Sequence, residues 1–120
     1  TIRDRVKIND EAETAWHGVK KWLEAGKPLA GIYSTAGGNE GVARALEAFG
    51  VQEQVIFAGH ELSESSRLLL EKGTMDMVMG NDMRREIEQC LAIFEQPLSG
   101  RSPEDIKSPL LIYHRYSYFS

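Results

Sequence analysis

Short apolar runs alternate with amphipathic segments through the middle of the chain. Three runs have the length of a strand and are closed by polar residues or glycine; they cover residues 29–33, 54–58 and 76–80. In the segments around them, hydrophobic residues recur every three or four positions, which is the period of one helical face. Strands that begin about every two dozen residues, with a helix between them, are typical of a parallel sheet. We therefore predict an α/β fold, a three-layer αβα arrangement with a mainly parallel sheet.

Residue types that favour helix ends predict where the helices begin and stop. Asp10 with Glu13 is a predicted capping pair for the first helix, and Ser63 is a predicted cap for the third. Glycine adopts the left-handed conformation that commonly ends a helix. Each of the first three predicted helices is followed by one: Gly26, Gly50 and Gly73.

A fourth predicted helix starts after the third strand and has one apolar stripe. The stripe consists of Met83, Ile87, Cys90, Leu91 and Phe94. Residues 97–109 hold three prolines, one glycine and three serines, a composition that indicates a long loop. A β-rich run, Leu110 to Tyr116, follows the loop and predicts a final strand.

Polar pairs follow each of the three central strands. These pairs are Ser34-Thr35, His60-Glu61 and Asn81-Asp82. Because parallel strands point the same way, their carboxyl ends meet at one edge of the sheet, which is where ligands bind in open α/β sheets. Hydroxyl, imidazole, carboxamide and carboxylate groups together suit a polyhydroxylated or similarly polar small molecule. Each pair taken singly also fits a purely structural role, because serine, asparagine and aspartate are common caps and turn formers.

Two enzymatic interpretations compete with simple ligand binding at this edge. The segment Ala36 to Gly41 approximates the GxGxxG motif of dinucleotide-binding folds, but its first glycine is missing. Ser34, His60 and Asp82 have the residue types of a hydrolase triad, yet nothing resembling a nucleophile elbow surrounds Ser34.

A metal site is a third alternative, and it would draw on His60, Glu61 and Asp82. The three histidines of the chain are scattered, and no two fall at a ligand spacing. We therefore expect no catalytic residues, no metal and no cofactor.

The length, charge and cysteine content of the chain limit the kinds of partner that we expect. At 120 residues the chain is expected to form a single domain. The net charge is -4 and no run of lysine and arginine is longer than Lys20-Lys21, so we expect no direct contact with nucleic acid and no membrane association. Cys90 is the single cysteine, which excludes an internal disulfide and favours a reducing compartment.

Order and spacing along the chain resemble a known family. The matching segments are 31–33, 41–46, 55–61 and 73–82, within a resemblance that covers about Asp10 to Tyr116. They look like the carboxyl-terminal lobe of type I periplasmic-binding-protein-like domains, above all the sensor domain of LacI-family transcription regulators. In that family the ligand lies between two lobes, and the matching ligand positions here are Thr35-Ala36, His60-Glu61 and Asn81-Asp82.

The resemblance implies a function and a context. The chain, residues 1–120, would be one excised ligand-sensing lobe, with its partner lobe and any DNA-binding domain elsewhere. It would bind a small-molecule effector such as a sugar, form a homodimer through the region of Leu68, Leu69 and Leu70, and act in the cytoplasm. The alternative is half of a periplasmic sugar-binding protein of an ABC transporter, and a nucleotide-cofactor-binding enzyme domain is the third choice. A helix-turn-helix in the preceding sequence would favour the regulator, and a signal peptide would favour the transporter.

The last helix would pack on the partner lobe in this resemblance, because the chain crosses the hinge just after the third strand. Without that lobe, we expect its stripe to fold back onto the sheet or to exchange with a neighbouring molecule.

Overall fold

The computed structural model describes residues 1–100 and 108–117. Four helices, one short 3₁₀ helix and four strands follow one another in these ranges. Their bounds are α1 Ala12–Glu24, β1 Gly31–Tyr33, α2 Asn39–Ala48, β2 Ile56–His60, α3 Glu64–Lys72, β3 Met77–Asn81, α4 Met83–Phe94, η1 Leu98–Gly100 and β4 Leu110–His114.

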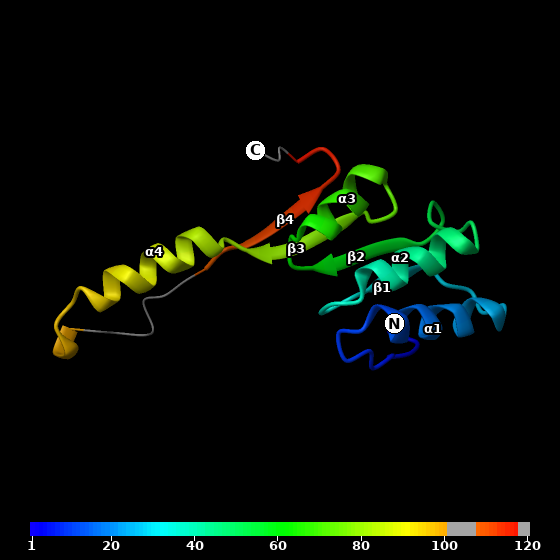
Figure 1. Cartoon of the computed structure of the whole chain (residues 1–120), viewed down its shortest axis with the longest axis horizontal. Coiled ribbons are helices and arrows are strands. Elements are labelled where there is room, and N and C mark those ends of the chain that lie inside the picture. The colour runs from blue at the N-terminus through cyan, green and yellow to red at the C-terminus, as the bar shows by residue number, and fades with distance from the viewer. Residues whose placement is uncertain (101–107, 118–120) are drawn as a thin grey trace.

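The strands form one open sheet in the order β1-β2-β3-β4 (Figure 1). β1 pairs with β2 and β2 with β3 in parallel, whereas β4 returns antiparallel to β3. The carboxyl ends of β1, β2 and β3 therefore point to the same side of the molecule. This arrangement confirms the predicted α/β class and the mainly parallel sheet.

One face of the sheet carries the hydrophobic core. Phe57 and Val78 project from β2 and β3 and are fully buried, together with Leu46 of α2 and Leu70 of α3. Ala15 of α1 belongs to the same cluster. α2 and α3 cover this face and α1 packs against α2, so the described residues supply two of the three predicted layers.

The opposite face of the sheet is not covered by any helix of the described residues, and we call it the uncovered face. Alternate residues of the strands point to it, and several large side chains there are exposed: Tyr33, Ile56, Met77, Leu110 and Ile112. Alternation of buried and exposed positions is the period of two that a strand imposes.

α4 projects from this body as an arm (Figure 1). No residue of the helix is buried, and Ile87, Leu91 and Phe94 are each more than half exposed. The radius of gyration is 17.8 Å, against about 14 Å expected for a compact domain of this length. The helix does not pack on the sheet, so the expected fold-back is wrong for this chain. Exchange with a neighbouring molecule, the other expected outcome, stays a prediction.

Of the two predicted helix caps, one is confirmed and the other is wrong. Ser63 caps α3 as predicted, and its side chain accepts from the Ser66 backbone N–H in a reciprocal capping box. The predicted Asp10 cap of α1 is wrong, because Glu11 is the N-cap residue and makes no side-chain cap bond. The Asp10 carboxylate instead accepts from the Gly37 N–H at 2.9 Å, and so ties α1 to the turn before α2.

Strand boundaries are shifted toward the carboxyl ends. The predicted 54–58 run begins inside a turn, where the N–H groups of Gln54 and Val55 both donate to the Val51 carbonyl. β2 therefore starts at Ile56 and runs on to His60, and β3 runs on to Asn81. As a result His60 and Asn81 lie within strands rather than in the turns that follow them. The predicted 97–109 loop holds η1, and its residues 101–107 lie outside the described ranges.

Candidate functional site at the carboxyl edge of the sheet

Hydrogen bonds between the strands bring the predicted polar pairs to one edge. The Ser34 N–H donates to the Ala58 carbonyl at 2.9 Å, and the Glu61 N–H donates to the Met79 carbonyl at 2.8 Å. Each strand end is thus held beside the next strand. Asn81 pairs with Leu110 at the end of β3, one step further along the edge.

His60 and Asn81 point to the same, uncovered face of the sheet. His60 pairs in register with Met79, and Asn81 lies two residues beyond Met79, so their side chains share a face. The His60 ring is half-buried, and its Nδ1 atom is shielded from solvent without a hydrogen-bond partner in the described residues. A shielded nitrogen without a partner is energetically unfavourable unless an ordered water or a ligand hydrogen-bonds to it.

Glu61 has an unusual backbone conformation. Its φ is 65°, in the left-handed region that non-glycine residues rarely adopt, and the residue is exposed. Such a conformation costs on the order of 1–3 kcal/mol and tends to occur at functional sites. Glu61 directly follows β2, and its N–H still donates to the Met79 carbonyl of β3.

Ser34 and Asp82 make local structural bonds. The Ser34 hydroxyl donates to the Ala36 carbonyl at 3.3 Å, and the residue is 6% exposed. The Asp82 carboxylate caps α4 by accepting from the Arg85 N–H at 3.1 Å. These bonds hold the turn and the helix end, and they give no support to a hydrolase triad. Thr35 is exposed beside Ser34, in the turn between β1 and α2.

The glycines around the start of α2 serve backbone conformation and packing. Gly38 adopts φ 90° at the N-cap position of α2. A Cβ on Gly41 would clash with the Ala12 carbonyl oxygen, so glycine allows α2 to approach α1. Both observations explain the glycine pattern without a phosphate, and the dinucleotide interpretation gains no support.

Asn39 is a polar residue at this edge that the sequence interpretation did not select. It begins α2, is 8% exposed, and its Oδ1 atom has no hydrogen-bond partner within the described residues. In the sequence it stood inside a glycine-rich turn and had the appearance of an ordinary helix start. Its burial depends on Gly59 of β2, which no local pattern reveals.

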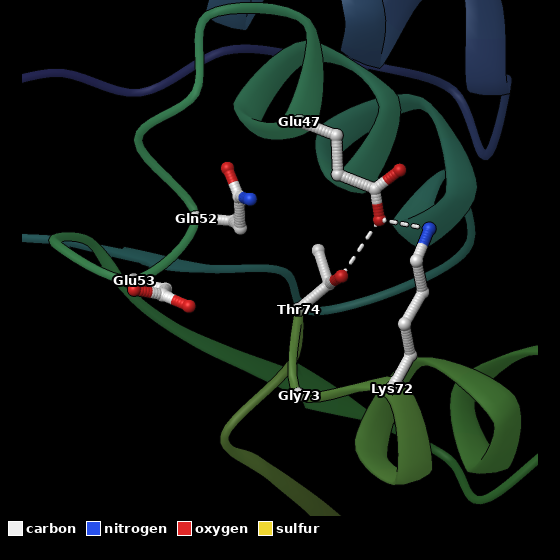
Figure 2. A pocket seen from close by; sticks show the side chains of 6 residues that line it. All are labelled: Glu47, Gln52, Glu53, Lys72, Gly73 and Thr74. Atoms are coloured by element: carbon white, nitrogen blue, oxygen red, sulfur yellow. Dashed lines mark hydrogen bonds and ion pairs between the residues drawn. The ribbon is translucent and has the colours of Figure 1, made fainter.

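The opposite edge of the sheet has a well-paired polar cluster (Figure 2). Oε1 of Glu47 accepts from the Lys72 ammonium at 2.8 Å and from the Thr74 hydroxyl at 2.6 Å. These two hydrogen bonds, the one from Lys72 being the stronger influence, lower the pKa of Glu47 below its usual value. The cluster borders an open depression of about 230 Å³ that Gln52 and Glu53 also line.

Searches for metal clusters and membrane helices give no candidates in the parts of the chain that the structure describes. No three histidine, cysteine, aspartate or glutamate side chains come close enough there to hold a metal ion. No helix in residues 1–100 or 108–117 is long and apolar enough to cross a bilayer.

Comparison with models of protein families shows which family the chain belongs to. A model described as the periplasmic binding protein domain matches residues 1–102, which is most of the chain. The chain belongs to this family. No protein with a curated function matches the sequence.

Several solved structures that share this fold are described as sugar-binding or solute-binding proteins. An ABC transporter solute-binding protein from Agrobacterium vitis, bound with α-D-tagatopyranose, has a TM-score of 0.81 at 14% identity over 96% of this chain and 39% of its own. A second solute-binding protein from Agrobacterium vitis, with bound D-fucose, has a TM-score of 0.78 at 17% identity over 96% of this chain and 40% of its own. GanP, a glucose-galactose binding protein from Geobacillus stearothermophilus, has a TM-score of 0.78 at 14% identity over 91% of this chain and 40% of its own.

This periplasmic-binding-protein domain therefore spans about two fifths of the length of the structures that it resembles. At these identities the likeness shows a shared fold. These comparisons do not show membership of the LacI family of regulators, which stays a prediction. The homodimer and the cytoplasmic location also stay predictions.

Proposed function

We propose that this chain is one lobe of a receptor that binds a sugar or a similarly polar small molecule at the carboxyl edge of its sheet. The observation that carries the proposal is the parallel register: His60 lies opposite Met79, the Glu61 N–H bonds to the Met79 carbonyl, and Asn81 follows two residues later on the same face as His60. The unpartnered Nδ1 of His60 and the left-handed backbone of Glu61 support it. The sugar-bound neighbours give the ligand class.

The receptor context is that of a solute-binding protein of an ABC transporter. Its support is the set of neighbours described as ABC transporter binding proteins. A location outside the cytoplasm goes with this context. No step of bond-making or bond-breaking is part of the proposal.

The sensor domain of a LacI-family regulator is the second candidate. The segment Gly59-His60-Glu61-Leu62 and the β-rich tail favour it through the sequence resemblance. Both candidates use the same edge and the same ligand class. The coding sequence that precedes residue 1 discriminates them, because a helix-turn-helix specifies a cytoplasmic regulator and a signal peptide specifies a transport receptor.

The site is tested by removing one carboxylate from it. Glu61→Ala in the full-length protein should weaken sugar binding by about 1–3 kcal/mol, because a hydroxyl of the ligand loses its acceptor. Titration calorimetry with D-glucose, D-galactose, D-fucose, D-allose and D-tagatose measures the effect. Glu53→Ala is the matched control, since it removes an exposed carboxylate from the opposite edge. Equal affinity of Glu61→Ala and wild type would contradict the assignment.

The exposed arm is part of the same proposal. We expect the apolar stripe of α4 to pack on a second lobe that comes from the remainder of the receptor. The support is that Met83, Ile87 and Leu91 are exposed here, and that the neighbours are more than twice as long as this chain. Burial of such side chains is worth roughly 1.5–3 kcal/mol each.

Cys90 reports on this packing, because it is exposed on the same helix. Peptide-level mass spectrometry of thiol labelling should show Cys90 reacting fast in the 120-residue chain and slowly in the full-length protein. Equal rates in the two proteins would contradict the packing of α4 on a second lobe.

A further inference from the structure

The carboxamide of Asn39 lies beneath the end of β2. A Cβ placed on Gly59 would be 3.2 Å from Asn39 Nδ2 and 3.3 Å from Oδ1, so the amide rests against the strand at the residue before His60. Gly59 faces the helix side of the sheet and His60 the uncovered side. Asn39 and His60 therefore flank the end of the same strand from its two faces.

The Asn39 side chain is buried without satisfying its hydrogen bonds. The residue is 8% exposed, and Oδ1 is shielded from solvent with no partner in the described residues. A carboxamide in this state destabilises the protein relative to an apolar side chain of the same shape. Exchanging the oxygen and nitrogen ends of the amide would shield the nitrogen in its place.

Helix capping does not account for Asn39. The N-cap residue of α2 is Gly38, and no side chain makes a cap bond there. Asn39 is the first helical residue, a position at which its side chain gives nothing to the helix end. The neighbouring Ser34, by contrast, is buried and has the Ala36 carbonyl as a partner.

We propose that Asn39 is a further ligand-binding residue, whose carboxamide hydrogen-bonds a hydroxyl of the ligand. The inference rests on the proposed function and adds to it a polar group at the helix side of the edge. The start of α2, a ten-residue helix, favours electron-rich groups of the ligand nearby through the positive end of its dipole. The site would thus hold a neutral, hydroxyl-rich molecule between the β1 turn and the end of β2.

The experiment compares Asn39→Leu with wild type in the full-length protein. Leucine has about the same shape and removes the unpartnered amide. Gln52→Leu is the matched control, because Gln52 Oε1 is also shielded without a partner but lies at the opposite edge (Figure 2). Calorimetry with the five sugars named above gives affinities, and thermal unfolding without sugar gives Tm.

Asn39→Leu should weaken binding by about tenfold or more and leave Tm unchanged or raised. Gln52→Leu should change the affinity less than about twofold. An affinity for Asn39→Leu within about twofold of wild type overturns the inference alone, and so does a fall in Tm of more than about 3 °C, which would show a structural role. A wild-type protein that binds none of the five sugars contradicts the proposed function, and the inference falls with it.

Discussion

The two edges of the sheet differ in how their polar side chains are paired. At the amino edge, one carboxylate oxygen of Glu47 accepts from both the Lys72 ammonium and the Thr74 hydroxyl, while Gln52 Oε1 is shielded there without a partner in the described residues. At the carboxyl edge, Asn39 Oδ1 and His60 Nδ1 are shielded and have no partner in the described residues. Paired groups stabilise the fold as it stands, whereas unpaired groups need a ligand or water. The proposed function accounts for this difference, because the two unpaired atoms of the carboxyl edge lie where the ligand is proposed to bind.

The largest effect on stability is expected at the amino edge. Glu47→Ala leaves the Thr74 hydroxyl, in a residue that is 2% exposed, without its acceptor. The free energy of unfolding should fall by about 1–3 kcal/mol, as urea denaturation would measure. Sugar affinity should not change, and a loss of affinity equal to that of Glu61→Ala would abolish the distinction between the edges.

A smaller effect of opposite sign is expected at the carboxyl edge. Glu61→Gly relieves the left-handed backbone at φ 65° and should stabilise the protein by about 1 kcal/mol. The same variant should bind sugar more weakly, because the carboxylate is lost. Glu61→Ala is the control, since alanine keeps the backbone strain. If Glu61→Gly is less stable than Glu61→Ala, the strain at this position is not real.

Acid sensitivity provides a graded test of the amino edge. Glu47 has a pKa below its ordinary value of 4.5 in the folded state, first because of its hydrogen bond from Lys72. A carboxyl group whose pKa is lower in the folded than in the unfolded protein stabilises the fold at pH values above its unfolded pKa. This stabilisation is lost as the pH falls through the folded pKa. Stability should therefore decline below about pH 4.5, and Glu47→Gln should show a shallower decline over that window. Parallel pH profiles of the two proteins would contradict this role. The pKa of Glu64 is also lowered, by Arg67, and this contribution remains in the variant.

The smallest effect on folding is expected at Leu68. This side chain is 51% exposed, while Leu70 in the same helix is fully buried, so at least one of the three leucines faces outward as predicted. Leu68→Ser should change the free energy of unfolding by no more than about 0.5 kcal/mol. If α3 forms the predicted dimer, sedimentation of the full-length protein should show a dimer that Leu68→Ser dissociates. A monomeric wild type at micromolar concentration would exclude it.

Periodicity in the sequence was enough to predict the class, the sheet direction and the edge. The apolar runs and the glycine and serine signals near Ser63 and Gly73 depend on local physics, and the structure confirms them. The Asp10 cap failed because a contact 27 residues away, to Gly37, competes for the same carboxylate. Long-range partners of this kind leave no local pattern.

The site was predictable in part for the same reason. Parallel strands bring His60, Glu61 and Asn81 together by topology alone, so residue type and position indicated them. Asn39 was missed because its burial against Gly59 is tertiary. The residue type of Asp82 allowed either a ligand contact or a helix cap. The hydrogen bond from the Arg85 N–H shows that Asp82 caps α4.

A crystal structure of the full-length protein with the tightest-binding of the five sugars tests the central claim most directly. We predict that the sugar lies within hydrogen-bond distance of at least two of His60, Glu61 and Asn81. A sugar seated instead in the depression lined by Glu47, Gln52 and Thr74 would contradict the assignment of the carboxyl edge as the binding edge.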